Sequence, residues 1–349
     1  MNHLQQGSRV LDLLIGPPIG RGAFGEIYSS IDVKTGIIWA LKTESNDARR
    51  KTLKFEFQVI AQVQSSPCFP RLGVFAISDR FSFISEEFLG PSLSHILKRL
   101  PSKRFTLSTA LRASYHILKC IESFHVFGFV HRDIKPGNIL TREGTENPLC
   151  LIDFGLARVY VNPQTGQHLP QRKHVGFRGT RAYASKNAHN GHDLSRRDDL
   201  ISWFYLTYEF IVDLLPWRGE QDKHTILDLK NNFDVESKVR SIAPELTLIW
   251  DHINSLAFEE TPNYKFISQC LLTKFEQTVG GKMDDPYDWS EMLHKHRNIV
   301  AKALENMQPM KDAQINISDN GIQQRLLDPG RKFESPFSNM TDSDTCGCC

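Results

Sequence analysis

Residues 131–138 read HRDIKPGN, and residues 153–155, beginning twenty positions after Asp133, read DFG. A carboxylate at Asp133 is suited to orienting a hydroxyl group and accepting its proton. Asn138 and Asp153 offer the hard oxygen ligands that Mg²⁺ prefers. Each residue alone has an ordinary structural explanation, as a turn aspartate, a capping asparagine or part of a D-F-G turn. Their joint occurrence in this order indicates phosphoryl-transfer chemistry.

A glycine-rich stretch lies upstream, where residues 19–28 read IGRGAFGEIY between two strand-like segments. Glycines let backbone N–H groups approach phosphate oxygens because no Cβ stands in the way. A G-x-G-x-x-G match alone also fits a dinucleotide-binding loop or a hairpin turn. The dinucleotide alternative requires a helix after the loop, whereas the following residues favour a strand. The residues expected to bind the nucleotide here are Ile19, Gly20, Arg21, Gly22, Ala23, Phe24, Gly25, Glu26 and Ile27.

Three further charged residues complete the expected catalytic set. Lys42 ends a β-rich run seventeen residues after Gly25, and it can hold the α- and β-phosphates as a compact cation. Glu56, fourteen residues on in a helical stretch, is its expected acidic partner, because Glu44 is too near and shares the strand. Lys135 can neutralise the γ-phosphate as its charge shifts. Each is otherwise a solvated surface charge, so the roles depend on the whole set.

The chain changes character near Gly90-Pro91, a strong breaker pair. Before it, short β-rich runs and turns dominate, with one helical stretch around residues 48–63. After it, helical patterns follow, including residues 107–127 and the buried-helix pattern of residues 199–214. A strand-rich half joined to a helix-rich half predicts an α+β fold with a ligand cleft between the halves.

Composition excludes several function classes. The chain has 349 residues, 40% hydrophobic, with 42 basic and 40 acidic residues and a net charge of +2. So balanced a charge gives no reason to expect nucleic acid or an anionic membrane as a partner. The best apolar run, residues 203–217, is broken by two acidic residues, and the first twenty residues lack a signal-peptide pattern. Scattered cysteines favour reduced thiols and a cytoplasmic location.

The chain resembles a eukaryotic protein kinase over about residues 10–305, and within that superfamily the casein kinase 1 group. Three features carry this resemblance: the sequence LGPSL at residues 89–93, the form HRDIKPxN at residues 131–138, and GTRAYASKN at residues 179–187 in place of A-P-E. The tau-tubulin kinase branch is the most similar, through ALKTES, FRGT and LPWR at residues 40–45, 177–180 and 215–218.

This resemblance implies a two-lobed kinase with a five-stranded antiparallel N-lobe, about residues 10–88, and a helical C-lobe, about residues 91–305. It implies ATP and Mg²⁺ as cofactors, and protein Ser/Thr hydroxyls as substrates. Asp199 corresponds to the buried aspartate that supports the catalytic loop, and Thr180 to the threonine that links this loop to the substrate platform. We expect a monomer that is active without phosphorylation of its activation loop.

Two positions depart from the family pattern. The arginine that precedes the tyrosine of G-T-x-R-Y is Ala182 here, with Arg181 one place earlier. Nearby basic residues can still favour acidic or already phosphorylated substrates, or be only a solvated loop: Arg172, Lys173, His174 and Arg178. Glu86 stands where relatives carry an apolar residue behind the adenine. If buried, it must pair with Lys42 or be protonated, and we expect altered binding of ATP-site inhibitors; a local slip would place it outside.

The last 44 residues, 306–349, are rich in polar residues and predict a mostly disordered tail. The tail ends in Cys346, Cys348 and Cys349. Their spacing suggests S-palmitoylation or prenylation and hence membrane tethering, although Gly347 fits a C-a-a-X box poorly. Two or three lipids would be required for stable anchoring. Incidental cysteines or metal scavenging are the alternatives.

Three other functions stay open at this point. A pseudokinase scaffold keeps the fold and loses the chemistry; only Glu86 and Ala182 favour it, since the lysine, catalytic-loop and D-F-G residues are all present. An unrelated nucleotide-binding enzyme, such as a dehydrogenase, leaves residues 131–138 unexplained. The third is a kinase that is anchored by lipids and acts only on substrates at a membrane.

Overall fold

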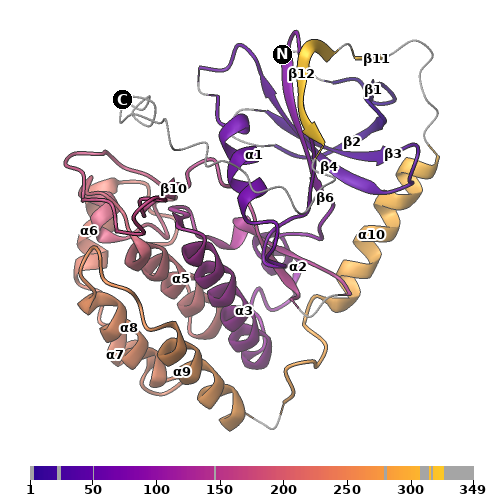
Figure 1. Ribbon diagram of the computed structural model, residues 1–349. Helices are drawn as coiled ribbons and strands as arrows, with labels where there is room; N and C mark the ends of the chain where they lie inside the picture. The colour runs from indigo at the N-terminus through magenta and orange to yellow at the C-terminus, as the bar shows by residue number, and fades with distance from the viewer. Residues whose placement is uncertain are drawn as a thin grey trace. The chain divides into compact units, whose positions relative to one another are not determined.

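The computed structural model describes residues 4–21, 25–49, 51–144, 147–278, 281–306, 314–315 and 317–325. The chain divides into two compact units, one formed by Met1–Gly90 with Glu291–Cys349 and the other by Pro91–Ser290 (Figure 1). The first is built on a β-sheet and the second mainly on helices. This confirms the predicted α+β class, with strands first and helices after the Gly90-Pro91 pair.

The first unit contains a sheet whose strands, as far as the structure describes them, follow the order β11-β1-β2-β3-β4-β6-β5-β12. Neighbouring strands are antiparallel, except that β1 and β11 are parallel. The bounds are β1 Arg9–Val10, β2 Leu13–Arg21, β3 Glu26–Asp32, β4 Ile38–Ser45, β5 Leu72–Ser78, β6 Phe81–Glu87, β11 Gln314–Ile315 and β12 Ile317–Arg325.

The expectation of five strands is therefore too small. Strands β2, β3, β4, β6 and β5 form the antiparallel sheet that was expected, and β1, β11 and β12 extend it at both edges. Strands β11 and β12 come from the segment for which the sequence predicts a mostly disordered tail. Their backbone groups are paired with edge strands, which the low apolar content of this segment does not reveal. The terminal cysteines lie outside the described residues.

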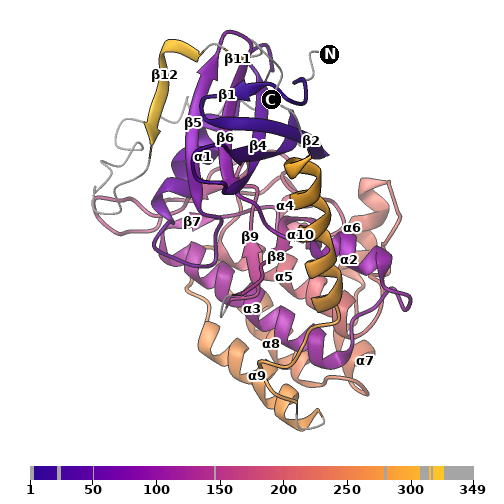
Figure 2. The same ribbon diagram turned by 90° about the vertical axis from the view of Figure 1, so that its right-hand side faces the viewer.

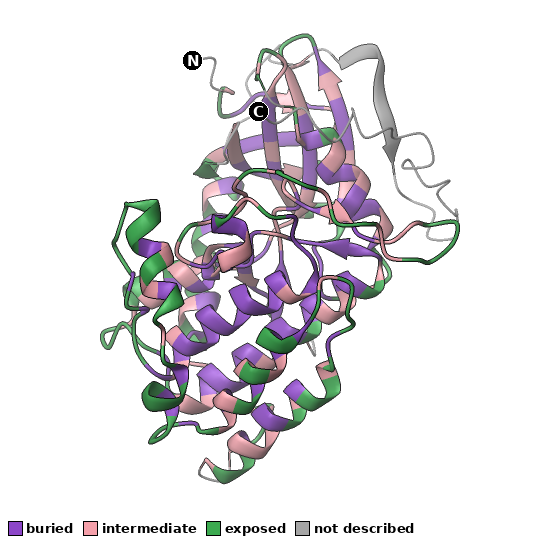
Figure 3. Cartoon of the chain, turned by 90° about the vertical axis from the view of Figure 1, so that its left-hand side faces the viewer, coloured by how far each residue is buried: buried purple, intermediate pink, exposed green. Residues whose placement is uncertain are grey.

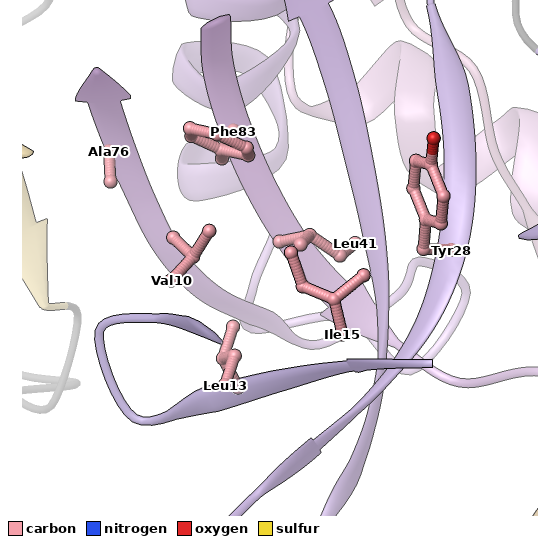
Figure 4. Packing of buried hydrophobic residues seen from close by; sticks show 7 residues of the cluster. All are labelled: Val10, Leu13, Ile15, Tyr28, Leu41, Ala76 and Phe83. Carbon is pink, nitrogen blue, oxygen red and sulfur yellow. The ribbon is translucent and has the colours of Figure 1, made fainter. Parts of the chain in front are cut away.

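Apolar residues on one face of this sheet form its core (Figure 4). The cluster combines residues from the six strands β1 to β6: Val10, Leu13, Ile15, Tyr28, Leu41, Ala76 and Phe83. Full burial of such a side chain contributes about 1.5–3 kcal/mol. Alternation along each strand thus fixes which face carries the core and which face carries the polar residues.

Helix α10 (Ser290–Glu305) packs in the first unit from Glu291 onward. Its C-terminal end lies beside β2 (Figure 2), where a Cβ on Gly16 would stand 2.5 Å from Leu304 Cδ2. Its middle stacks His296 on Phe88, with ring centroids 6.0 Å apart. The boundaries predicted from the sequence place residues 291–305 in the C-lobe instead, because a helical pattern does not state what its apolar face covers.

The second unit contains the helices α2 to α9, and many residues of these helices are buried (Figure 3). Their bounds are α2 Leu93–Arg99, α3 Leu107–Val126, α4 Lys186–His189, α5 Arg196–Ile211, α6 Lys223–Asn231, α7 Val235–Val239, α8 Glu245–Ser255 and α9 Tyr264–Gln277. Helix α5 is almost entirely buried, as its sequence predicts, although its first turn is charged. Trp203 in α5 donates its indole N–H to Ser114 O of α3 at 2.9 Å, which fixes the two helices together.

Among the described residues, no helix is long and apolar enough to span a bilayer.

Candidate active site

Two short strand pairs enclose the predicted catalytic loop, residues 131–138. Strand β7 (Phe129–Val130) precedes the loop and pairs with β10 (Arg158–Val159). Helix η1 (Pro136–Asn138) ends the loop, and β8 (Ile139–Thr141) pairs next with β9 (Leu149–Leu151). Because β9 leads into the DFG segment, Ile152 N donates to Asn138 O at 3.0 Å. The pairing therefore brings both predicted metal ligands, Asn138 and Asp153, to one end of the same hairpin.

Asp133 is the centre of a hydrogen-bonded cluster in the second unit. Thr180 Oγ1 donates to Asp133 Oδ1 at 2.7 Å, and Lys135 Nζ donates to Oδ2 at 2.6 Å. Lys135 Nζ also donates to Thr180 Oγ1 at 3.0 Å, and Asn138 Nδ2 donates to Asp133 O at 2.9 Å. The structure thus brings together three predicted residues, Asp133, Lys135 and Asn138, with the threonine that the resemblance implies. These donors fix the orientation of the carboxylate.

Gly179 lets the segment that carries Thr180 approach the catalytic loop. Its φ is +95°, and a Cβ there would lie 2.6 Å from Arg132 O. An L-residue with a side chain is strained in this conformation and would also push against backbone. Glycine is therefore required for Thr180 to reach Asp133.

Asp199 in α5 supports the catalytic loop from inside the second unit. Its carboxylate accepts the backbone N–H groups of His131 and Arg132, both at 2.7 Å, and His125 Nε2–H at 2.9 Å. Burial alone raises the pKa of Asp199, but these hydrogen bonds outweigh it and lower the pKa. Burial lowers the pKa of His125, so the neutral ring donates to Asp199 and accepts from Tyr264 Oη at 2.6 Å through Nδ1.

Two non-glycine residues at the site have left-handed backbones, Arg132 with φ 68° and Asp153 with φ 69°. A residue in this region costs of order 1 kcal/mol, and short polar residues such as aspartate tolerate it best. Arg132 is held there by its side chain, which donates to Leu156 O at 2.7 Å and Ala157 O at 3.3 Å. The strain lies at the two segments that carry the expected chemistry.

Arginines gather next to Arg132 and form what we call the arginine cluster: Arg132, Arg158 and Arg172. Burial lowers the pKa of Arg132 to about 9, assisted by the charges of the other two arginines. Asp193 is buried between them, with Arg158 Nη1 at 2.6 Å and Arg172 Nη2 at 3.1 Å from its carboxylate oxygens. Burial raises the pKa of Asp193, but the arginines outweigh this and lower it. The cluster thus gathers three guanidinium groups, two of which hold the buried carboxylate of Asp193.

Lys42 and Glu56 form an ion pair in the first unit, as the sequence predicts. Lys42 Nζ lies 2.7 Å and 2.6 Å from the two carboxylate oxygens of Glu56, which is only 1% exposed. Helix α1 (Leu53–Gln62), which carries Glu56, begins at a carboxylate supplied by another element. Glu44 of β4 accepts the backbone N–H groups of Thr52 at 2.8 Å and Leu53 at 3.2 Å. Glu44, which its place on the strand of Lys42 rules out as a partner of that lysine, instead holds the start of α1.

The glycine-rich loop connects β2 and β3. Strand β2 ends at Arg21 and β3 begins at Glu26, and Gly22, Ala23 and Phe24 lie outside the described residues. A Cβ on Gly25 would stand 1.8 Å from Thr43 O, so this glycine is required for packing on β4. Among the described residues, a Cβ on Gly20 would meet only Ile27, at an ordinary 3.7 Å. Packing against this part of the chain does not explain Gly20.

Glu86 lies on the same face of the sheet as Lys42. The register of β4 and β6 pairs Ala40 with Glu86 and Lys42 with Ile84, without a bulge. Side chains of directly opposed residues, and of residues two apart on one strand, share a face. A local slip that places Glu86 outside is therefore not observed. Altered inhibitor binding stays a prediction, which a comparison of wild type with Glu86→Met would test.

The sequence did not single out His125, Tyr264 or Asp193, although all three hold the loop or the arginine cluster in place. His125 offered a weak signal, a histidine in the last turn of a helix six residues before His131. Tyr264 and Asp193 offered none, because each meets its partners only through folding. In the described part of the chain, no cluster of three or more His, Cys, Asp or Glu side chains forms a metal centre.

A β-sheet unit with a Lys–Glu ion pair and a helical unit with a supported HRD loop and DFG turn together define a protein-kinase fold. Residues 14–281 match the family model described as protein kinase domain. The chain belongs to the protein kinase family.

A curated relative from Dictyostelium discoideum, named a probable serine/threonine-protein kinase, is 35% identical over 273 residues. The aligned region covers 78% of this chain and 55% of the relative, so the chain spans little more than half of that protein.

Proposed function

We propose that this protein transfers the γ-phosphoryl group of MgATP to serine and threonine hydroxyls of other proteins. The observation that carries the proposal is the cluster around Asp133, whose two carboxylate oxygens accept from Thr180 at 2.7 Å and Lys135 at 2.6 Å. The name of the relative from Dictyostelium discoideum agrees with this chemistry. We further propose a casein kinase 1 type, supported by the sequence motifs at residues 89–93, 131–138 and 179–187.

In this mechanism Asp133 accepts the proton of the substrate hydroxyl while orienting its oxygen for attack. Lys135, already hydrogen-bonded to Asp133, places a positive charge where the transferred group gains charge. Thr180 holds the other carboxylate oxygen and so prevents rotation of Asp133. Positioning and charge, more than covalent chemistry, account for the rate of such reactions.

The residues present fit MgATP. Bound MgATP supplies the phosphoryl group and the cation that neutralises its charge. Asn138 uses its Nδ2 group as a donor to Asp133, which leaves its amide oxygen as a hard ligand, and Asp153 adds a carboxylate. Lys42, fixed by Glu56, would hold the α- and β-phosphates. Gly20, which packing against the described residues does not require, would allow close approach of phosphate to the backbone.

We also propose a preference for acidic or already phosphorylated substrates. The arginine cluster supports it, because it gathers three guanidinium groups, the fork-shaped donors that suit a phosphate or carboxylate, beside the catalytic loop. Arg181, displaced by one position relative to the family pattern, is exposed and donates to Gln221 O at 3.1 Å. The arginine cluster, more than Arg181, would then attract the anion.

The test uses the full chain, labelled MgATP, casein, and acidic, phosphorylated and basic peptides. Asp133→Asn should reduce transfer by about 100-fold or more, because the amide cannot accept the proton. The control Asp228→Asn changes an exposed aspartate in α6 and should retain activity. Equal transfer by wild type and Asp133→Asn would refute the mechanism. If wild type binds MgATP but transfers nothing, the pseudokinase alternative gains support.

A further inference from the structure

Lys230 is a buried lysine in the last turn of α6, with only 2% of its surface exposed. A lysine in such a helical position usually extends into solvent, since burying an ammonium group costs several kcal/mol unless it is hydrogen-bonded. Lys230 is fully bonded. Its Nζ donates to Arg181 O at 2.7 Å and Ala184 O at 2.6 Å, and lies 3.2 Å from His189 Nε2.

Aromatic rings surround the same ammonium group. Nζ lies 5.1 Å from the ring centre of Tyr205 and 5.2 Å from that of Trp217, distances at which an aromatic face attracts a cation. Trp217 in turn donates its indole N–H to Ala182 O at 2.7 Å. The carbonyl groups of residues 181, 182 and 184 are therefore all held by the interior of the second unit.

These three carbonyl groups belong to what we call the platform segment, residues 180–184. Its first residue, Thr180, donates to Asp133, and its backbone turns back on itself through Ala184 N, which donates to Thr180 O at 2.9 Å. Tyr183, next to the anchored carbonyls, is fixed by Glu209 at 2.5 Å and by Arg218 at 2.7 Å. A shift of this segment would move the backbone beside the reacting hydroxyl.

We infer that Lys230 is a positioning residue, which fixes the platform segment and thereby determines the affinity for the protein substrate rather than for ATP. This inference rests on the proposed kinase function. The contacts of the Lys230 ammonium group go to main-chain atoms of the platform segment, to His189 and to aromatic rings. Removal of Lys230 takes the charged donor away from the carbonyl groups of residues 181 and 184 and so loosens the segment.

The protonation states of Lys230 and His189 depend on their burial and on the charges around them. Burial lowers the pKa of Lys230 to about 7, and burial together with the nearby Lys230 charge lowers the pKa of His189 to about 4. Neutral His189 can therefore accept from the ammonium through Nε2. The other groups that act on this pair are Arg181 and, from the start of α6, Lys223. Burial keeps Tyr205 neutral by raising its pKa.

Loss of the proton above about pH 7 removes the charge that strengthens both carbonyl contacts and the attraction to the rings. Binding of protein substrate should then weaken as the pH rises from 7 to 9.

The experiment compares Lys230→Met with wild type in steady-state phosphorylation of a peptide that wild type phosphorylates. Lys230→Met should raise the KM for peptide by about tenfold or more, the effect of losing charge-assisted hydrogen bonds, with the KM for ATP within about twofold. The matched control, Lys238→Met, alters an exposed lysine of α7 and should change neither constant. An unchanged KM for peptide in a folded Lys230→Met protein would overturn the inference.

A second variant and the pH profile guard against a misfolded Lys230→Met. His189→Ala keeps both carbonyl contacts, so it should stay folded and raise the KM for peptide by a smaller factor, about two- to fivefold. In wild type, kcat/KM for peptide should fall above pH 7 while the KM for ATP stays constant. A KM for peptide unaffected by His189→Ala, together with a flat profile, would refute the role of Lys230. Absence of any transfer by wild type would refute the proposed function instead.

Discussion

At the scale of single residues, Asp199 is the point where the hydrogen bonds of the catalytic loop converge. It is 1% exposed and accepts from two successive backbone N–H groups and from His125. A carboxylate has enough lone pairs to accept all three, whereas no neutral side chain of the same size does. The left-handed backbone of Arg132 is stable because one of these bonds holds its N–H group.

Asp199→Asn should therefore be destabilising although it conserves shape. The amide has one acceptor oxygen and an NH₂ group, so at least one buried donor of the loop would face another donor. The expected loss is about 3 kcal/mol of unfolding free energy, together with a fall in kcat, measured by urea denaturation and phosphate transfer. Asp251→Asn, at an exposed position of α8, is the control. Wild-type stability in Asp199→Asn would contradict the supporting role.

At the scale of elements, the glycine-rich loop depends on how β3 and β4 approach each other. Thr43 Oγ1 of β4 accepts from Glu26 N at 3.2 Å and donates to Glu26 O at 3.0 Å, which ties the strands together directly after Gly25. Gly25 has no room for a side chain, since Thr43 O lies 1.8 Å from where a Cβ would be. The two described glycines of the loop thus serve different purposes.

Alanine at each position should separate these purposes. Gly25→Ala should lower the unfolding free energy by about 2 kcal/mol or more, because the clash is with backbone and the strands must move apart. Gly20→Ala should leave stability unchanged, within about 0.5 kcal/mol, and weaken nucleotide binding instead. Thermal unfolding and binding of MgATP measure the two effects. Equal stability of the two variants would contradict the requirement for glycine at position 25.

Contacts with other elements also stabilise helices α1 and α10. Glu44 lies on a strand and holds the first turn of a helix, and Leu304 lies on α10 and occupies the space left by Gly16. In both cases an element is stabilised by a residue of another element, from close by in the sequence for Glu44 and from near the other end of the described chain for Leu304. Helix propensity alone accounts for little of this stability.

At the scale of the whole molecule, the folded chain contains several histidines that stay neutral. Burial lowers the pKa of His116 and of His189 to about 4, with help from the charges of Arg112 and Lys230 respectively, and burial lowers the pKa of His125 as well. In the unfolded chain histidines titrate near pH 6.5. Between these values the unfolded state binds more protons than the folded state, so stability decreases as the pH falls.

The free energy of unfolding should accordingly fall on acidification from pH 7 to pH 5. The expected loss is about 1–2 kcal/mol for each of His116 and His189, obtained from their pKa difference of the two states. Urea denaturation at several pH values measures it, and His116→Gln should show a smaller loss than wild type. Stability that is constant over this interval would contradict neutral burial of these histidines.

The sequence by itself determined the residues that carry the chemistry and the class of the fold. Phosphoryl transfer requires fixed residue types at fixed local spacings, so residues 131–138 and 153–155 could be recognised without a structure. The ion pair of Lys42 with Glu56 followed from the whole set of motif residues, and the buried helix α5 from its density of apolar residues. These features are local in the chain, and local patterns report them directly.

Only the tertiary structure decided which distant residues meet. The position of α10 beside β2, the strands β11 and β12, the bond of His125 to Asp199 and the burial of Lys230 all join segments forty or more residues apart. A sequence pattern states that a helix has an apolar face or that a lysine is present, but not which partner covers them. That choice belongs to the packing and desolvation of the folded chain, where buried polar groups require particular partners.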